Sequence, residues 1–116
     1  MRGGEPRPGE ALAARRCRPL PSGTPALAAA DCAAYLAQLP GWELAAGRLR
    51  RTYSLPDFAR ALALVNAIGG LAEAEDHHPD IALSWGKVGV ELWTHSVDGL
   101  SENDFILAAK IEALDR

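Results

Sequence analysis

The three histidines are the side chains of this sequence best suited to acid–base chemistry near neutral pH. His77 and His78 are adjacent, and His95 follows later in the chain. Acidic residues crowd the adjacent pair: Glu73, Glu75, Asp76 and Asp80. Histidine changes charge near neutrality, and neighbouring carboxylates orient its ring. These residue types predict a general acid–base site, provided that the fold brings the three histidines together.

Two other roles for the histidines are open from the sequence. A His-His pair that follows a helix can be a polar helix end, where the imidazoles cap exposed carbonyls. A zinc site is the second alternative, but the chain has no CxxC or HExxH pattern, and adjacent histidines rarely converge on one ion. Ser96, next to His95, is an open candidate for a nucleophile.

The first half of the sequence predicts a helix followed by a hairpin. An alanine-rich segment over about residues 27–39 has apolar residues at helical spacing and stops at a Pro-Gly pair. Residues 42–45 and 48–53 are predicted strands, with a glycine in the turn between them. Trp42, at the start of this hairpin, is predicted to be a core anchor or a platform for a flat ligand.

Two further helices are predicted. One begins after Ser54 as N-cap, with Pro56 in its first turn, and ends near Glu75. Its expected core face consists of Phe58, Leu62, Val65, Ile68 and Ala72. The last helix follows Ser101, which forms a capping-box pattern with Asp104. Its apolar stripe is Phe105, Ala108, Ile111 and Leu114.

A second hairpin is predicted between these two helices. Two apolar runs, residues 81–85 and 88–94, flank a Gly-Lys pair that is typical of a two-residue turn. Side chains alternate between the two faces of a strand, so one set is expected on the core side. That set is Ile81, Leu83, Trp85, Val88, Val90 and Leu92.

The register of this hairpin decides where the histidines lie. Counting outward from the turn places His78 opposite His95, and a slip of one residue puts His77 there instead. His78 and His95 then project away from the core, as does Trp93. The register therefore predicts that all three histidines meet at one end of the hairpin. Trp93 is expected to line a pocket or to lie in a subunit contact.

The element order αββαββα predicts an α+β fold with a four-stranded antiparallel sheet and three helices packed on one face. A length of 116 residues, with 48% hydrophobic and 23% charged residues, fits one globular domain. Residues 1–25 are rich in glycine, proline and arginine. They are predicted to be a disordered leader outside the domain, which covers residues 26–116.

Charge and hydropathy argue against two classes of partner. The net charge is −3, and residues 1–25 are basic, so the rest of the chain is acidic. An acidic body disfavours nucleic acid as the partner. No apolar run is long enough for a membrane helix, and the first residues lack the apolar core of a secretory signal. The expected location is the cytoplasm.

The residue pattern resembles the pterin-4a-carbinolamine dehydratase family. Each motif is weak alone, but the set is specific in its order and spacing. The motifs are Gly41-Trp42, Glu73-x-x-x-His77-His78-Pro79-Asp80, Lys87-Val88, and His95 followed by GLSENDF at residues 99–105. The resemblance runs from about Ala29 to Leu114, and residues 1–25 lie outside it.

The resemblance implies an activity. Members of this family remove water from 4a-hydroxytetrahydropterin, which gives quinonoid dihydropterin and recycles the pterin used by aromatic amino acid hydroxylases. The implied enzyme needs no metal and no organic cofactor. The implied fold is a four-stranded antiparallel sheet backed by three helices, and subunits are expected to join sheet edges in a homodimer or homotetramer.

The resemblance also assigns roles to residues. The implied catalytic residues are His77, His78 and His95, with His77 and His95 as acid and base and His78 mainly holding the pterin. The implied substrate-binding set is Asp76, His77, His78, Trp93, Thr94 and His95. The implied supporting residues are Glu73, Trp42 and Asp104.

The main alternative to an enzyme is a non-enzymatic relative on the same fold. Such relatives serve as protein-binding dimerisation partners in transcription or as assembly factors for carbon-fixation enzymes. Relatives without activity are expected to lose the histidines, and this chain keeps all three. The sequence therefore favours the enzyme.

Overall fold

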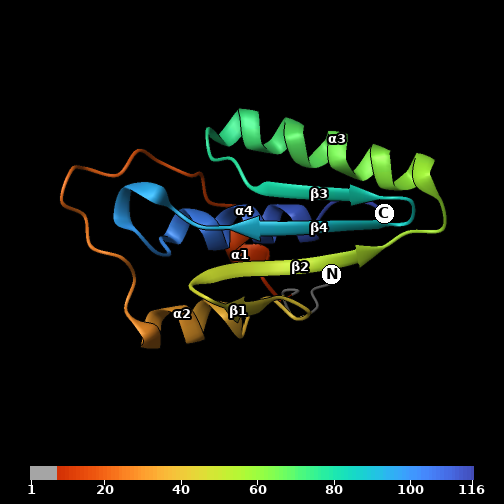
Figure 1. Cartoon of the computed structure of the whole chain (residues 1–116). Coiled ribbons are helices and arrows are strands. Elements are labelled where there is room, and N and C mark those ends of the chain that lie inside the picture. The colour runs from red at the N-terminus through yellow and green to blue at the C-terminus, as the bar shows by residue number, and fades with distance from the viewer. Residues whose placement is uncertain (1–7) are drawn as a thin grey trace, which may run out of the picture.

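The computed structural model describes residues 8–116 as an α+β fold with a four-stranded antiparallel sheet (Figure 1). The strands are β1 (Glu43–Ala45), β2 (Arg48–Ser54), β3 (Asp80–Ser84) and β4 (Lys87–Leu92), in the spatial order β1-β2-β4-β3. The helices are α1 (Glu10–Ala13), α2 (Ala29–Leu36), α3 (Phe58–Glu75) and α4 (Glu102–Glu112), with a 3-10 turn η1 (His95–Val97) before α4. The predicted order αββαββα is confirmed from α2 onward, with α1 ahead of it.

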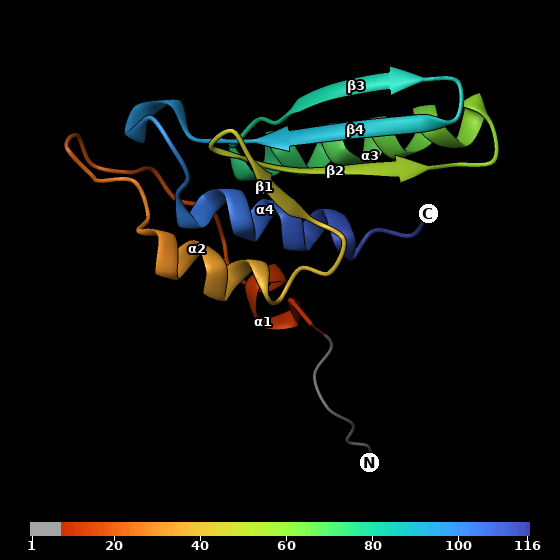
Figure 2. The same cartoon turned by 60° about the horizontal axis from the view of Figure 1, so that its bottom comes forward.

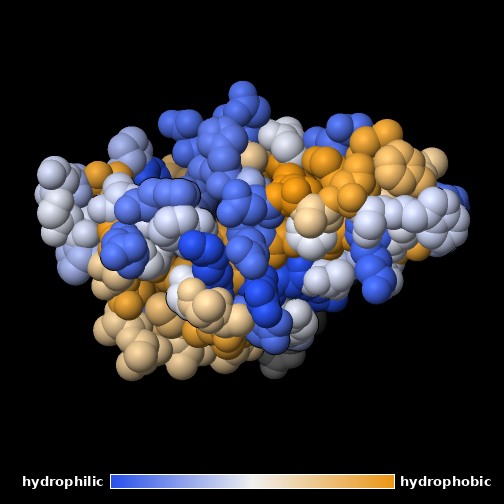
Figure 3. All heavy atoms as spheres, viewed as in Figure 1, coloured by the Kyte–Doolittle hydropathy of each residue, from blue (hydrophilic) through white to orange (hydrophobic). Residues whose placement is uncertain are grey.

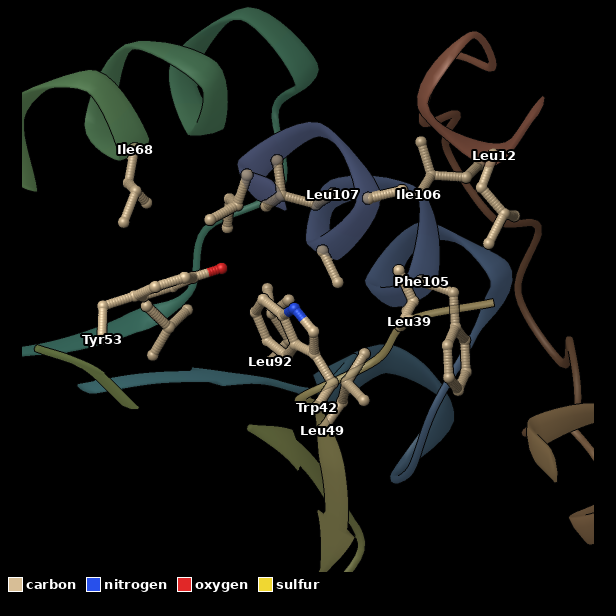
Figure 4. Close-up of a cluster of buried hydrophobic side chains, with 14 of the residues drawn as sticks. Leu12, Leu39, Trp42, Leu49, Tyr53, Ile68, Leu92, Phe105, Ile106 and Leu107 are labelled. Carbon is tan, nitrogen blue, oxygen red and sulfur yellow. The ribbon is translucent and has the colours of Figure 1, made fainter. Parts of the chain in front are cut away.

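Helix α4 is the centre of the core. Residues 103–109 of this helix are all buried, so it is enclosed on every side and not only along the predicted stripe. The inner face of the sheet covers one side of α4 with Leu49 and Leu92 (Figure 4). Val90 of β4 is buried in the same core. Figure 2 shows α2 and α1 on the side of α4 that faces away from the sheet. The helices therefore form layers on one face of the sheet.

The N-terminal segment differs from the predicted disordered leader. Residues 1–7 lie outside the described residues, but Leu12, Ala13 and Cys17 of the predicted leader pack in or against the core. Leu12 of α1 is 1% exposed within the core, and α1 contacts α4. Lys110 of α4 donates from Nζ to the Ala13 carbonyl at 2.8 Å. The segment is ordered because α4 has apolar side chains on all faces, and one of those faces needs this cover.

The second hairpin has a different register from the predicted one. Its turn is Trp85-Gly86, because Ser84 pairs with Lys87 and Ile81 with Val90. The predicted core side is confirmed for β4, whose Val88 and Val90 are buried. Leu83 pairs with Val88 and so lies on the predicted side, although it is 36% exposed on the edge strand. The prediction is wrong for Trp85, which lies in the turn and is 69% exposed. The turn is fixed from outside the hairpin, where Leu55 N–H donates to the Gly86 carbonyl at 2.8 Å.

Helix α3 begins later than predicted, and its buried face differs. Its N-cap is Asp57 and not Ser54, and the Asp57 carboxylate accepts the Arg60 N–H at 2.8 Å. The helix ends at Glu75 as predicted. Its buried face is Ala61, Leu64, Ile68 and Ala72, at helical spacing. Small alanines let α3 lie close to its neighbours, whereas Phe58 and Leu62 are 44% and 41% exposed.

Exposed apolar side chains gather over α3 and the adjacent end of the β3–β4 hairpin (Figure 3). We call this set the apolar patch; it consists of Phe58, Leu62, Leu83 and Trp85. None of the helices in residues 8–116 combines the length and the apolar character that crossing a membrane requires.

Candidate active site

The end of helix α3 positions the two adjacent histidines. Asp76 adopts a left-handed backbone conformation, with φ 51° and ψ 44°, directly after the last helical residue. Aspartate is one of the few residues other than glycine that visit this region readily. The chain turns there, and the His77 N–H donates back to the Ala72 carbonyl at 3.1 Å. This turn directs His77 inward and leaves Asp76 and His78 exposed.

His77 is paired with a buried carboxylate. Its Nε2 lies 2.6 Å from Oδ1 of Asp104 in the first turn of α4. The His77 side chain is 12% exposed and the Asp104 side chain 0% exposed. A carboxylate accepts hydrogen bonds, so Nε2 of His77 donates to it and Nδ1 is left free to exchange a proton with a ligand.

The second oxygen of Asp104 is held by two other groups. Thr94 Oγ1 donates to Oδ2 at 2.7 Å, and the Ser101 N–H donates to it at 2.9 Å. The Thr94 and Ser101 hydroxyls are also hydrogen-bonded, at 2.7 Å. The predicted capping box of Ser101 and Asp104 is confirmed. The same carboxylate therefore caps α4, orients His77, and ties the segment after β4 to both.

His78 has its own carboxylate partner on the surface. Its Nε2 lies 2.5 Å from Oε2 of Glu73 in the last turn of α3. The side chains are 55% and 79% exposed, so water screens this pair. The two histidines thus differ in setting: His77 is held from inside by a buried partner, whereas His78 is held at the surface.

His95 is placed by a short loop after β4. The strand ends at Leu92, and Thr94 and Gly99 form an isolated bridge in which the Thr94 N–H donates to the Gly99 carbonyl at 2.8 Å. His95 begins the 3-10 turn that this bridge closes, and its side chain is exposed. The Trp93 ring lies tilted against the His95 ring, with a centroid distance of 3.7 Å and an interplanar angle of 37°.

The structure links the predicted site residues by a route other than strand pairing. The predicted pairing of His78 with His95 is wrong, because β4 has ended before His95 and the hairpin register is shifted. The link instead runs from His77 through Asp104 to Thr94, whose next residue is His95. The ends of α3 and β4 and the beginning of α4 therefore meet at one carboxylate.

Trp42 lies away from this group. Its side chain is buried, and its Nε1 donates to Oε1 of Glu112 at 3.0 Å, at the other end of α4 from Asp104. Of its two sequence interpretations, the core anchor matches its 5% exposure. The structure does not bring Trp42 together with the histidines.

Two contacts beside the site could not be predicted from the local sequence pattern. The Arg48 guanidinium carbon lies 4.1 Å from the centre of the Trp93 ring. Arg48 starts β2 and Trp93 follows β4, so only the pairing of these two strands, which are distant in sequence, could have revealed the contact. A second example is the N-terminal segment, where Arg18 and Asn103 exchange two hydrogen bonds beside Asp104.

The arrangement is suited to moving protons. An imidazole whose far nitrogen is held by a buried carboxylate keeps its tautomer and orientation, which is how general acid–base sites are built. A second imidazole, His95, follows a residue bonded to that carboxylate. In residues 8–116, no group of three or more His, Cys, Asp and Glu side chains is placed to hold a metal ion.

Comparison with known proteins gives the same motifs a family. The family model described as pterin 4 alpha carbinolamine dehydratase matches residues 25–114. A provisionally named pterin-4-alpha-carbinolamine dehydratase of Methylococcus capsulatus is 46% identical over 105 residues, which cover 89% of this chain and 92% of that protein. One of Rubrobacter xylanophilus is 42% identical over 104 residues, covering 89% and 97%.

A solved structure supports the same assignment. The crystal structure of a transcriptional coactivator/pterin dehydratase from Brucella melitensis is similar with a TM-score of 0.73 and 30% sequence identity, covering 76% of this chain and 96% of that chain. The matches to the Methylococcus and Rubrobacter relatives each cover 89% of this chain, which is more than residues 26–116 alone. Part of residues 1–25 is therefore matched, and the similarity extends further than its motifs indicated. The chain belongs to the pterin-4a-carbinolamine dehydratase family.

Proposed function

We propose that this protein is a dehydratase that removes water from 4a-hydroxytetrahydropterin by histidine acid–base catalysis. One observation carries the proposal: Nε2 of His77 is hydrogen-bonded to the fully buried Asp104. A polar surface loop has no need of such a pair, whereas a proton-transfer site needs a histidine with a fixed tautomer. Family membership supplies the substrate class.

The reaction needs two proton transfers. The bond from C4a to the hydroxyl oxygen breaks as that oxygen receives a proton, and it leaves as water. A ring nitrogen next to C4a loses its proton, and its electron pair forms the new double bond of quinonoid dihydropterin. One proton is delivered and one is removed, so the two histidines return to their starting states together after exchange with solvent. No metal or organic cofactor takes part in these steps.

We assign the two transfers to His77 and His95. His77 offers Nδ1, because Asp104 occupies its other nitrogen. His95 is exposed and follows Thr94, which bonds the same Asp104. His78, exposed and paired with Glu73, holds the pterin together with the exposed Asp76. In the cell, this activity would recycle, in the cytoplasm, the pterin spent in aromatic amino acid hydroxylation.

The test is a dehydration assay on 4a-hydroxytetrahydropterin generated in situ, with the spontaneous reaction as baseline. We expect the protein to accelerate dehydration, and His77→Ala and His95→Ala each to lower the rate by about 100-fold, the usual contribution of an acid–base group. His78→Ala should mainly raise KM. Near-normal rates in all three variants would defeat the assignment.

The alternative role as a protein-binding or assembly factor is separated in the same experiment. The Brucella relative is named as both a coactivator and a dehydratase, and the apolar patch is a surface that a protein could cover. A rate equal to the spontaneous one, together with recovery of a stoichiometric protein partner, would favour that role over the enzyme.

We also propose that the chain forms a homodimer or homotetramer. Among residues 8–116, the one strand that pairs with β3 is β4, so the other edge of β3 has backbone groups free for a second copy. The apolar patch lies beside that edge, with Leu83 on β3 itself. Light scattering should give two or four times the mass of the 12.3 kDa chain, and Leu83→Glu should lower it. A monomeric wild-type protein would contradict this proposal.

A further inference from the structure

We propose that Trp93 and Arg48 are positioning residues, which hold the His95 imidazole in the orientation that proton transfer needs. The inference rests on the proposed function and adds to it two residues that act through His95. It differs from the expectation that Trp93 contacts the pterin directly, and the two roles give different kinetics.

The first observation is how closely the two rings lie. Offset-stacked and edge-to-face aromatic pairs keep their centroids about 4.5–7 Å apart. The Trp93 and His95 centroids are 3.7 Å apart with an angle of 37° between the planes, so the two tilted rings are in close contact. Thr94, the residue between them, has an extended backbone with φ −116° and ψ 106°, so the indole and the imidazole leave the backbone on the same side. The indole therefore limits the rotation of the imidazole.

The second observation is what holds the indole. The guanidinium carbon of Arg48 lies 4.1 Å from the Trp93 ring centre, too close for any position other than over the ring. Leu49 pairs with Leu92, so the next pair outward is Arg48 and Trp93 on the outer face of the sheet. Contact with a cation over its face fixes the indole against the sheet.

Arg48 is itself held by charges on that face. Its Nη1 lies 3.8 Å from Oε1 of Glu91, and Arg50 lies 3.4 Å from both Glu91 and Glu43. Arg48 is 34% exposed, less than Arg50 at 45%. The outer face of the sheet thus ends in an ordered cation, which lies over Trp93 next to His95.

The third observation is that the described structure gives His95 no carboxylate partner of the kind that orients the other two histidines. His77 and His78 each have a carboxylate on Nε2. Within the part of the chain that the structure describes, neither ring nitrogen of His95 has a hydrogen-bonding partner. Contact with the indole limits the ring plane without occupying either nitrogen, so His95 is held while both nitrogens stay available for proton transfer. Correct orientation is worth large factors in rate.

The inference is tested by nuclear magnetic resonance and kinetics on Trp93→Ala, Trp93→Phe and His95→Ala, alone and combined. In the wild type, the carbon-bound ring protons of His95 should be shifted upfield by the indole, and those of His77 should not. Trp93→Ala should abolish the shift, and Trp93→Phe should keep part of it. This readout needs no activity, so it stands apart from any failure of the proposed function.

The kinetic arm separates positioning from pterin binding. Trp93→Ala should lower kcat by at least about tenfold with KM nearly unchanged, and Trp93→Phe should restore most of it. In a His95→Ala background, Trp93→Ala should have no further effect. A raised KM at normal kcat, an additive effect in the double variant, or an unshifted His95 in the wild type would each overturn the inference.

Arg48→Met against Arg50→Met tests the role of Arg48. Both arginines lie on the outer face and contact Glu91, but only Arg48 lies over Trp93. We expect Arg48→Met to reduce the upfield shift of His95 and to lower kcat, and Arg50→Met to change neither. If the two variants behave alike, the role assigned to Arg48 is wrong.

Discussion

The two ends of helix α4 each carry a carboxylate with three hydrogen-bond donors, yet their chemistry differs. Asp104, in the first turn, receives His77, Thr94 and the Ser101 N–H. Glu112 is the last residue of α4, and its Oε1 accepts three hydrogen bonds. The donors are Trp42 Nε1 at 3.0 Å, Arg51 Nη1 at 2.8 Å and Tyr53 Oη at 2.5 Å. The carboxylates are on the order of 12 Å apart along the helix.

The difference lies in the donors. The indole of Trp42 and the guanidinium of Arg51 keep their protons at any physiological pH. Burial, together with the hydrogen bond to Glu112, raises the pKa of Tyr53 well above its ordinary value, so this hydroxyl also stays protonated. Of these two ends, only the Asp104 end has a histidine among its donors, the residue type most used in general acid–base catalysis. The same helix therefore combines a structural carboxylate with one suited to catalysis.

The largest expected effect comes from substitutions at the Asp104 end of α4. Asp104→Asn and His77→Gln should each lower kcat/KM by about 100-fold, and the double variant should be no worse than either single one. The reason is that the two side chains act as one hydrogen-bonded unit. Steady-state dehydration kinetics measure the effect, with circular dichroism as the folding control. Losses that multiply in the double variant would show two independent roles.

The next largest effect comes from a substitution at the Glu112 end of α4, and it concerns stability. Glu112→Gln weakens three charge-assisted hydrogen bonds, so the free energy of unfolding should fall by about 1–3 kcal/mol. Urea denaturation measures this change. Tyr53→Phe, which removes only one of these bonds, should cost less and serves as the matched control. An unchanged midpoint in Glu112→Gln would contradict a stabilising role.

Alkaline pH should lower the free energy of unfolding in two steps, one from Cys17 and one from Tyr53. Burial raises the pKa of the Cys17 thiol from 9.0 to about 12. The unfolded thiol ionises first, so the free energy of unfolding should fall as pH rises from 9 towards 12. The raised pKa of Tyr53 adds a second fall above pH 10. Urea titrations should show that Cys17→Ala reduces the first and Tyr53→Phe the second; parallel curves for all three proteins would contradict both.

The smallest expected effect concerns the surface pair. Glu73→Gln should change the free energy of unfolding by less than about 0.5 kcal/mol, because Glu73 and His78 are mostly exposed. A thermal melt against Glu112→Gln compares an exposed carboxylate with a partly buried one. A loss as large as that of Glu112→Gln would mean that exposure does not decide what these pairs contribute.

Local signals in the sequence were enough for much of the fold. The capping box of Ser101 and Asp104, the end of α3 at Glu75 and the first hairpin each depend on residues a few positions apart. These features were predicted correctly for that reason. The histidines were chosen as site candidates by residue type alone, because few side chains can exchange protons near neutral pH.

Contacts between distant segments explain what the sequence could not reveal. The Trp85-Gly86 turn is held by the backbone of Leu55, and a side chain at Gly86 would lie 3.0 Å from the Leu55 carbonyl oxygen. That glycine is required by a neighbour outside the hairpin, so reading it as the start of a Gly-Lys turn gave the wrong register. The pairing of His77 with Asp104 and the order of the N-terminal segment likewise depend on contacts across the chain.

The most direct test of the central claim compares kcat/KM of Asp104→Asn and Glu112→Gln in one dehydration assay. Both variants replace a carboxylate of α4 by its amide, and both carboxylates have three donors. We predict a kcat/KM about 100-fold below that of the wild type for Asp104→Asn, and within about twofold of the wild type for Glu112→Gln. Equal losses in the two variants would contradict the claim that only the Asp104 end moves protons.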